Sequence, residues 1–174
     1  VVIGEAYVDF GCESALALLD RYPNLLVVRT MSKSRSLAGL RVGYAIGSAN
    51  LIAALNCVKN SFNSYTLDRL AQAGALASVE DEAYFQENRQ KVMATRARTA
   101  KALELLGFTV CPSQANFLFA SHPDHSGKEL LDGLREKGVL VRWWNQPRIS
   151  NYLRISVGTD AEMDVLLSAL RELL

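Results

Sequence analysis

The sequence has few of the residues that build metal centres and disulfide frameworks. Its 174 residues include only two histidines and three cysteines, and no two cysteines form a CxxC pair. This scarcity argues against a zinc-type site and against a disulfide-stabilised secreted domain, so we expect no bound metal. An odd number of widely separated cysteines is typical of proteins in the reducing cytoplasm.

Long apolar runs and an excess of one charge are also absent. No apolar run reaches the roughly 18 residues of a membrane span, and no basic-then-apolar leader opens the chain. The 19 basic and 18 acidic residues are scattered and leave a net charge of +1, which disfavours nucleic-acid and membrane partners. We therefore expect a cytoplasmic protein that acts on small molecules. Because the sequence opens on VVI without an initiator Met, we also expect a fragment.

Strand and helix patterns alternate in the first part of the chain. Continuous apolar strands separated by helices indicate an α/β unit whose sheet is covered on both faces. Thr66 or Ser64 is expected to cap the last helix of this part. The expected strands lie at 1–3, 25–28 and 41–47, and the expected helices at 14–22, 49–62 and 66–79.

A long charged stretch separates this part from a different pattern. Residues 81–106 contain neither Gly nor Pro and predict one extended helix of the kind that links two domains. Short strands and two helices follow Gly107, the last helix capped by Thr159 or Asp160, and they indicate a small α+β unit. We expect part of a large α/β domain over 1–80, a connecting helix over 81–106 and a small C-terminal domain over 107–174.

A polar, small-residue segment lies between two of the expected strands. Lys33 follows directly on a strand, at the carboxyl end where open α/β sheets bind ligands. Thr30 and Ser32 offer hydroxyls beside it, and the Arg41 guanidinium can grip a phosphate with two hydrogen bonds. A lysine that forms a Schiff base, together with a phosphate clamp, is the set of residues that pyridoxal phosphate requires. On spacing alone, a solvated loop explains Lys33 equally well.

The same segment resembles the lysine motif of fold-type I aminotransferases. RTMSKSRSLAGLRVGYAIG is similar to the motif of histidinol-phosphate aminotransferases in particular, and the likeness continues through GEAYVDF, SQANFLF and YLRISVGT over essentially the whole chain. The resemblance implies the C-terminal half of such an enzyme: part of the large three-layer α/β domain plus the small α+β domain. It also implies a chain about twice as long, a homodimer, and pyridoxal 5′-phosphate as the cofactor.

The resemblance assigns roles to six residues. Lys33 would form the Schiff base and shuttle protons between the substrate α-carbon and the cofactor. Tyr7 would hydrogen-bond the ring oxygen of the cofactor. Arg154 would receive the anionic end of the amino substrate, although a strand-end ion pair is an alternative role for it. The cofactor phosphate would be held by Thr30, Ser32 and Arg41.

One position departs from the family pattern. The family has DEAY where this chain has GEAY, so Gly4 takes the place of the aspartate that would bond the pyridinium nitrogen. Glu5 is a poor substitute, because neighbouring residues on a strand point to opposite faces. Loss of this partner is expected to slow carbanion formation severely while leaving imine formation possible.

Two other pairs of residues suggest structural roles. His122 and His125 lie in a Pro- and Asp-containing loop and are expected to be exposed, without a catalytic or metal-binding role. Trp143 and Trp144 are adjacent on a predicted strand and face opposite sides, so at most one of them lines a pocket and core packing is the expected role.

These features favour a pyridoxal-phosphate-dependent aminotransferase that exchanges the amino group of histidinol phosphate with 2-oxoglutarate in histidine biosynthesis. A threonine-phosphate-type decarboxylase and an aromatic aminotransferase share the scaffold and stay open as alternatives. A non-catalytic, effector-binding domain of the same fold is a further alternative, which Gly4 favours and which Lys33 and Arg41 disfavour. The 174 residues alone are expected to bind the cofactor weakly and to show no turnover.

Overall fold

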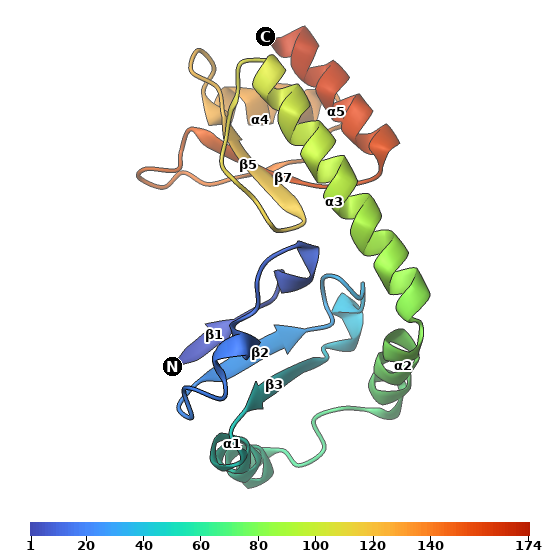
Figure 1. The fold of residues 1–174 in the computed structure, drawn as a ribbon. Coiled ribbons are helices and arrows are strands. Elements are labelled where there is room, and N and C mark those ends of the chain that lie inside the picture. Colours follow the sequence, from blue (N-terminus) through green and yellow to red (C-terminus); the bar gives the residue numbers. More distant parts are fainter. The chain divides into compact units, whose positions relative to one another are not determined.

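The computed structural model describes residues 1–174, which form two compact units. Unit 1 comprises Val1–Arg89 and unit 2 comprises Gln90–Leu174 (Figure 1). The extended helix expected over 81–106 is present as α3 (Glu82–Leu105), which runs through the boundary. The division into a large domain, a connecting helix and a small domain stays a prediction. None of the helices combines the length and the apolar character that crossing a membrane requires.

Unit 1 is built on a three-stranded sheet with the order β1-β2-β3 (Figure 1). β1 (Val2–Gly4) and β2 (Leu26–Thr30) are parallel, and β3 (Gly43–Gly47) runs antiparallel to β2. The carboxyl ends of β1 and β2 therefore share one edge of the sheet with the start of β3. Segments that leave or enter the sheet at this edge come together in space.

The sheet of unit 1 is covered less than the sequence predicts. Val27 is fully buried, whereas Val28, which points to the opposite face, is exposed. α1 (Ala49–Phe62) buries no residue, and α2 (Arg69–Glu80) buries only Ala71. Within these residues neither helix seals the second face of the sheet.

The helix expected over 14–22 is also wrong. Only a short 3-10 helix, η2 (Ala15–Leu18), forms there, and turns lead from it to β2. Nine residues are too few for a helix to be stable without packing, and Pro23 disfavours helical backbone at Tyr22. Two further 3-10 helices, η1 (Val8–Phe10) and η3 (Ala38–Leu40), lie in the segments beside the shared edge.

The helix α2 begins at a different cap from the one expected. The Asp68 side chain accepts a hydrogen bond from the amide of Ala71 at 2.8 Å and caps the helix. Thr66 and Ser64 therefore lie outside it. A carboxylate at this position satisfies one of the free amides of the first turn and also suits the positive end of the helix dipole.

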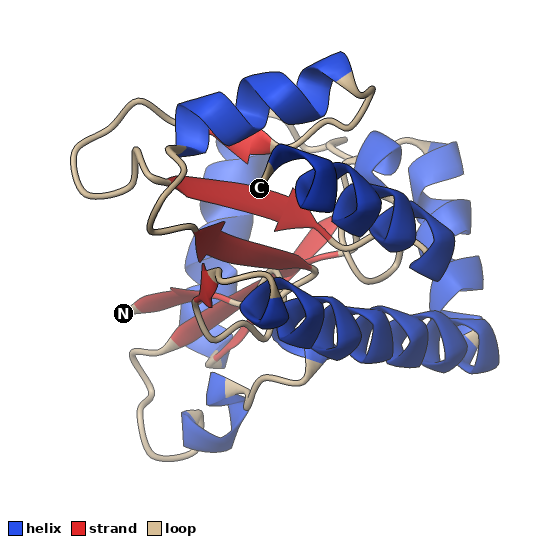
Figure 2. Ribbon diagram, turned by 90° about the horizontal axis from the view of Figure 1, so that it is seen from above, coloured by secondary structure: helices blue, strands red, loops and turns tan.

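Unit 2 is a four-stranded antiparallel sheet whose core is completed by helices, and α3 contributes the fully buried Leu103 to it (Figure 2). The order of the strands is β4-β5-β7-β6, so the two longest strands are central. The elements are β4 (Thr109–Val110), β5 (Phe117–Ser121), α4 (Gly127–Glu136), β6 (Arg142–Trp143), β7 (Tyr152–Ser156) and α5 (Asp160–Leu173).

Strict alternation along β5 and β7 separates a core face from a second face. Leu118 and Ala120 of β5, with Leu153 and Ile155 of β7, are buried against leucines of α4 and α5. The residues between them point the other way and are only partly buried. This second face carries Phe117, Phe119, Tyr152 and Arg154.

His122 is buried, which corrects the expectation that both loop histidines are exposed. Its ring is 8% exposed and lies 5.1 Å from the ring of Phe108, edge to face. Its Nε2 is 3.2 Å from the Leu106 carbonyl, and its Nδ1 accepts from the amide of Asp124 at 3.2 Å. The alternation of β5 explains this placement, since position 122 continues the core-facing series of positions 118 and 120.

Two other expectations for unit 2 are confirmed. Trp143 packs against the core and donates its indole N–H to the Ser150 carbonyl at 2.7 Å. Thr159 caps α5 through a reciprocal capping box with Glu162. Both contacts link a loop to a helix or strand of the same unit.

Candidate active site

Tyr7 and Lys33 lie together at the shared edge of the unit 1 sheet. Tyr7 follows β1 and Lys33 follows β2, and because these strands are parallel both residues emerge at the same edge. The Lys33 ammonium nitrogen is 5.6 Å from the centroid of the Tyr7 ring. Lys33 is exposed, so its amine is accessible to a ligand at this edge.

Of the three residues predicted to hold a phosphate, only Thr30 and Ser32 contact each other. The hydroxyls of Thr30 and Ser32 lie 2.9 Å apart, and the Ser32 amide donates to Thr30 Oγ1 at 3.1 Å. Arg41 enters β3 at the same edge but makes no hydrogen bond to either residue. Its guanidinium donates to the Ala38 carbonyl at 3.0 Å. The structure thus brings two hydroxyls together and leaves Arg41 exposed beside them.

This set of donors fits two groups of pyridoxal phosphate, its aldehyde and its phosphate. An exposed lysine amine suits the aldehyde, and two hydroxyls with a nearby guanidinium suit the phosphate. At Gly4 a side-chain Cβ would meet no atom within 4 Å, so the end of β1 borders open space. Residue 4 therefore supplies no carboxylate to the ring nitrogen of the cofactor.

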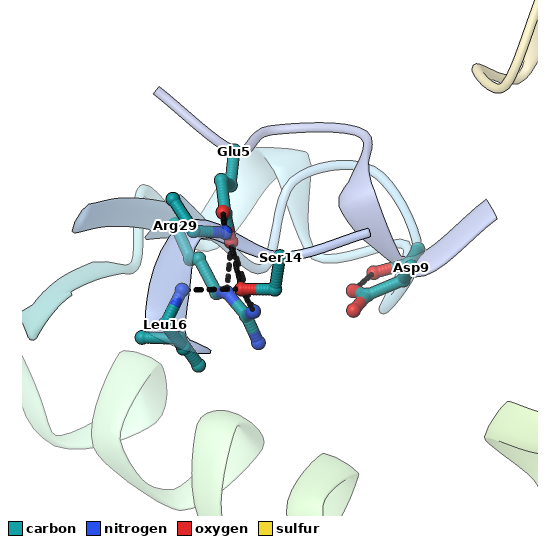
Figure 3. A network of polar contacts seen from close by, with 7 residues as sticks. Glu5, Asp9, Ser14, Leu16 and Arg29 are labelled. Carbon is teal, nitrogen blue, oxygen red and sulfur yellow. Dashed lines mark hydrogen bonds and ion pairs between the residues drawn. The ribbon is translucent and has the colours of Figure 1, made fainter. Parts of the chain in front are cut away.

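Glu5 is bound in a buried network and does not take the place of that carboxylate (Figure 3). Its carboxylate accepts from Arg29 Nε at 3.0 Å and Nη2 at 2.9 Å. It also accepts from the Ala15 amide at 2.6 Å and from the Ser14 hydroxyl at 2.9 Å. The side chain of Glu5 is only 6% exposed. The network joins the segment after β1 to the middle of β2.

The Glu5–Arg29 pair stays ionised because its hydrogen bonds outweigh the effect of burial. Burial raises the pKa of Glu5, but the bonds from Ala15, Ser14 and Arg29 bring that pKa below its ordinary value. Burial lowers the pKa of Arg29, but contacts with Glu5 and Tyr44 bring it above its ordinary value. This pair was not predicted from the sequence. The signal was an arginine inside the apolar run LLVVRT, because a charge on a buried strand needs a partner.

The residues that follow Lys33 anchor its loop on both sides. The Ser34 hydroxyl donates to the Asp9 carboxylate. Arg35 lies over the Phe85 ring, 3.7 Å from its centroid, and bonds Glu82 at 3.1 Å. Neither anchor was predicted, since each joins residues that are more than twenty positions apart in the sequence.

In unit 2, Arg154 lies on the aromatic second face of the sheet without an acidic partner. Its guanidinium carbon is 5.1 Å from the Phe117 ring centroid and 5.7 Å from that of Trp144. Its Nε is buried and has no hydrogen-bond partner. Arg142 pairs with Arg154 across the strands and lies 5.4 Å from the same Trp144 ring. The strand-end ion pair considered for Arg154 is therefore absent, and two unpaired cations mark a place for an anion.

Similar sequences match this chain over its whole length, and the match covers about half the length of each relative. Histidinol-phosphate aminotransferase 2 of Thiobacillus denitrificans is 61% identical over 174 residues, which are 99% of this chain and 49% of the relative. Histidinol-phosphate aminotransferase 2 of Rhizobium meliloti is 60% identical over 174 residues, 100% of this chain and 50% of the relative. The chain thus spans about half the length of the curated relatives it matches.

A solved structure and a family model agree with these relatives. The histidinol-phosphate aminotransferase of Sinorhizobium meliloti, solved in complex with pyridoxal-5′-phosphate, superposes with a TM-score of 0.84 at 28% identity, over 99% of this chain and 48% of that chain. This likeness confirms the expected fold class, part of a fold-type I α/β enzyme with a small α+β unit. Residues 1–170 match the family described as aminotransferase class I and II. The chain belongs to the class I and II aminotransferase family.

Proposed function

We propose that the intact protein catalyses pyridoxal-phosphate-dependent transamination between histidinol phosphate and 2-oxoglutarate, a step of histidine biosynthesis. The observation that carries the proposal is the accessible Lys33 amine beside the Tyr7 ring, at the edge of the sheet where α/β proteins bind ligands. The names of relatives about 60% identical to the chain support the choice of substrate.

In this proposal each residue at the sheet edge has a defined role. Bound pyridoxal phosphate supplies an aldehyde that carries the amino group and a ring that withdraws electrons. The Lys33 amine would hold the aldehyde end of the cofactor and would move a proton at the substrate α-carbon. The Tyr7 hydroxyl orients the ring, while Thr30, Ser32 and Arg41 hold the phosphate so that the ring does not drift.

The second face of unit 2 supports an anionic substrate. Arg154 is held between the rings of Phe117 and Trp144 with its Nε unpaired, and Arg142 adds a second positive charge at the same indole. Histidinol phosphate and 2-oxoglutarate both present an anionic group distant from the reacting carbon. Guanidinium groups accept phosphate and carboxylate through similar paired hydrogen bonds, so one site suits both substrates in turn.

A homodimer and a cytoplasmic location are part of the same proposal. Apolar side chains are exposed around the connection from α1 to α2: Phe62, Tyr65 and Leu70 are 79%, 93% and 78% exposed. Exposed apolar surface of this kind is typical of a site that another chain covers. A second copy and the remaining half of the large domain would both bury such surface. The 174 residues alone are then expected to show no turnover.

The proposal is tested in a reconstituted enzyme, in which residues 1–174 follow the first half of one of the relatives described above. We expect glutamate to form from 2-oxoglutarate only when histidinol phosphate is added, and Lys33→Ala to abolish this activity. Lys101→Ala, at an exposed lysine of α3, is the matched control and should leave the rate unchanged. Turnover that survives Lys33→Ala would contradict the proposal, and decarboxylation of phosphothreonine in place of transamination would favour the decarboxylase.

A further inference from the structure

The segment that carries Tyr7 is closed at its base. We call residues 5–14 the tyrosine loop; it leaves β1 at Glu5 and ends at Ser14, the cap of η2. The Ser14 hydroxyl donates to both carboxylate oxygens of Glu5, at 2.9 and 3.1 Å, and Arg29 donates to Ser14 Oγ at 2.8 Å (Figure 3). The two ends of the loop are therefore fixed to each other and to β2.

The tip of the tyrosine loop is fixed as well. The residues on either side of Asp9, Val8 and Phe10, are buried, so the backbone of η1 is held by packing. The Asp9 carbonyl accepts from Arg89 Nε. The Asp9 side chain stands apart from the Glu5 network and accepts from the hydroxyl of Ser34, the residue next to Lys33.

We propose that Asp9 is a positioning residue for Lys33 and acts through Ser34. Asp9 is two residues from Tyr7, and Ser34 is one residue from Lys33, so their hydrogen bond links the segment that carries the amine to the segment that carries the ring. Arg35, two residues after Lys33, bonds Ser78 and Glu82, which lie outside the tyrosine loop. The inference rests on the role of Lys33 given under the proposed function.

A positioning role predicts a chemical effect as well as a structural one. The Lys33 amine condenses with an aldehyde by forming a C–N bond and releasing water, and the rate depends on how the amine is presented. A misplacement of about 1 Å at a reacting group can cost on the order of a hundredfold in rate. A contact that merely stabilises the fold would change the stability of the tyrosine loop and leave this rate unaltered in the folded protein.

The test measures, in the reconstituted enzyme, how fast pyridoxal phosphate condenses with Lys33, by absorbance and by trapping with borohydride. We expect Ser34→Ala and Asp9→Ala each to slow the condensation by about tenfold or more, and the double variant to be no slower than either. Ser34→Thr, which keeps the hydroxyl, should retain the rate. Ser48→Ala is the matched control: like Ser34, Ser48 donates one hydroxyl hydrogen bond within unit 1, but its acceptor is the Pro23 carbonyl, away from Lys33 and outside the tyrosine loop.

A second readout needs no cofactor. In the 174-residue chain, Ser34→Ala should speed amide hydrogen exchange at residues 7–10, and Ser48→Ala should not. Unchanged condensation in Ser34→Ala, or additive losses in the double variant, would overturn the positioning role. Absence of any adduct in the unsubstituted enzyme would instead contradict the proposed function on which the inference depends.

Discussion

The substitution Glu5→Gln tests whether the buried network holds unit 1 together. It keeps the size of the side chain but removes its charge, leaving the Arg29 guanidinium without a counter-ion. Glutamine retains one acceptor oxygen, which can keep the bond from the Ala15 amide, but it loses the paired bonds from Arg29 at 2.9 and 3.0 Å.

The structure allows an estimate of the loss. The Glu5 and Arg29 side chains are 6% and 17% exposed, so solvent replaces little of the lost interaction. Breaking a buried ion pair by removing one partner costs about 3 kcal/mol or slightly more. Such a loss corresponds to about a hundredfold increase in the opening of unit 1.

The assay has to report on unit 1 alone. Tryptophan fluorescence does not do so, because Trp143 and Trp144 are the only tryptophans and both lie in unit 2. Native-state hydrogen exchange of peptides that cover β1 and β2 measures the opening directly. Glu82→Gln is the matched control: it removes another glutamate bonded to an arginine of unit 1, but its side chain is 56% exposed. A loss in Glu5→Gln no larger than in Glu82→Gln would show that the buried ion pair does not stabilise unit 1.

The same pair gives unit 1 a defined dependence on pH. Because the pKa of Glu5 in the folded chain lies below the ordinary value of 4.5, its contribution to stability is complete above that value. The contribution is lost as the pH falls through the lowered pKa. Glu5→Gln should therefore flatten the acid side of the stability profile, and an unchanged profile would contradict the ionised network.

Three further predictions concern single positions. Gly4→Asp should fold normally, because a Cβ at this position meets no atom within 4 Å. It should raise kcat of the reconstituted enzyme by about a hundredfold. An unchanged kcat would show that residue 4 does not face the ring. Thr159→Ala should cost unit 2 about 1 kcal/mol in urea unfolding followed by tryptophan fluorescence, and Ser168→Ala, exposed on the same helix, nearly nothing. Gly127→Ala should destabilise unit 2 in the same assay, because its Cβ would lie 2.9 Å from the Ser150 carbonyl oxygen.

Local patterns predicted most elements, because these depend on the spacing of residues close in sequence. The helix expected over 49–62 is α1, the stretch 81–106 without Gly or Pro contains α3, and YLRIS forms β7. The segment 14–22 failed because its helical spacing is short and its residues make tertiary contacts instead, with Ser14 bound to Glu5. His122 was misplaced because composition indicated a loop, whereas the register of β5 put it in the core.

The candidate site was predicted where a residue's type and its place on a strand suffice. Lys33 follows a strand and Arg154 lies on one, as expected, while their roles stay predictions. The partners that hold them could not be predicted, since they come from distant segments: Asp9 for Ser34, and Trp144 for Arg154. Only for Arg29 did the sequence carry a signal, since a charged residue inside an apolar run predicts a buried partner of opposite charge.

The most direct test of the account is to locate the lysine that binds the cofactor. The reconstituted enzyme is mixed with pyridoxal phosphate, reduced with borohydride, digested and mapped by mass spectrometry. We expect one pyridoxyl adduct, on Lys33, which Lys33→Ala abolishes and Lys101→Ala leaves intact. A stoichiometric adduct on another lysine, or none on Lys33, would contradict the assignment of the active site.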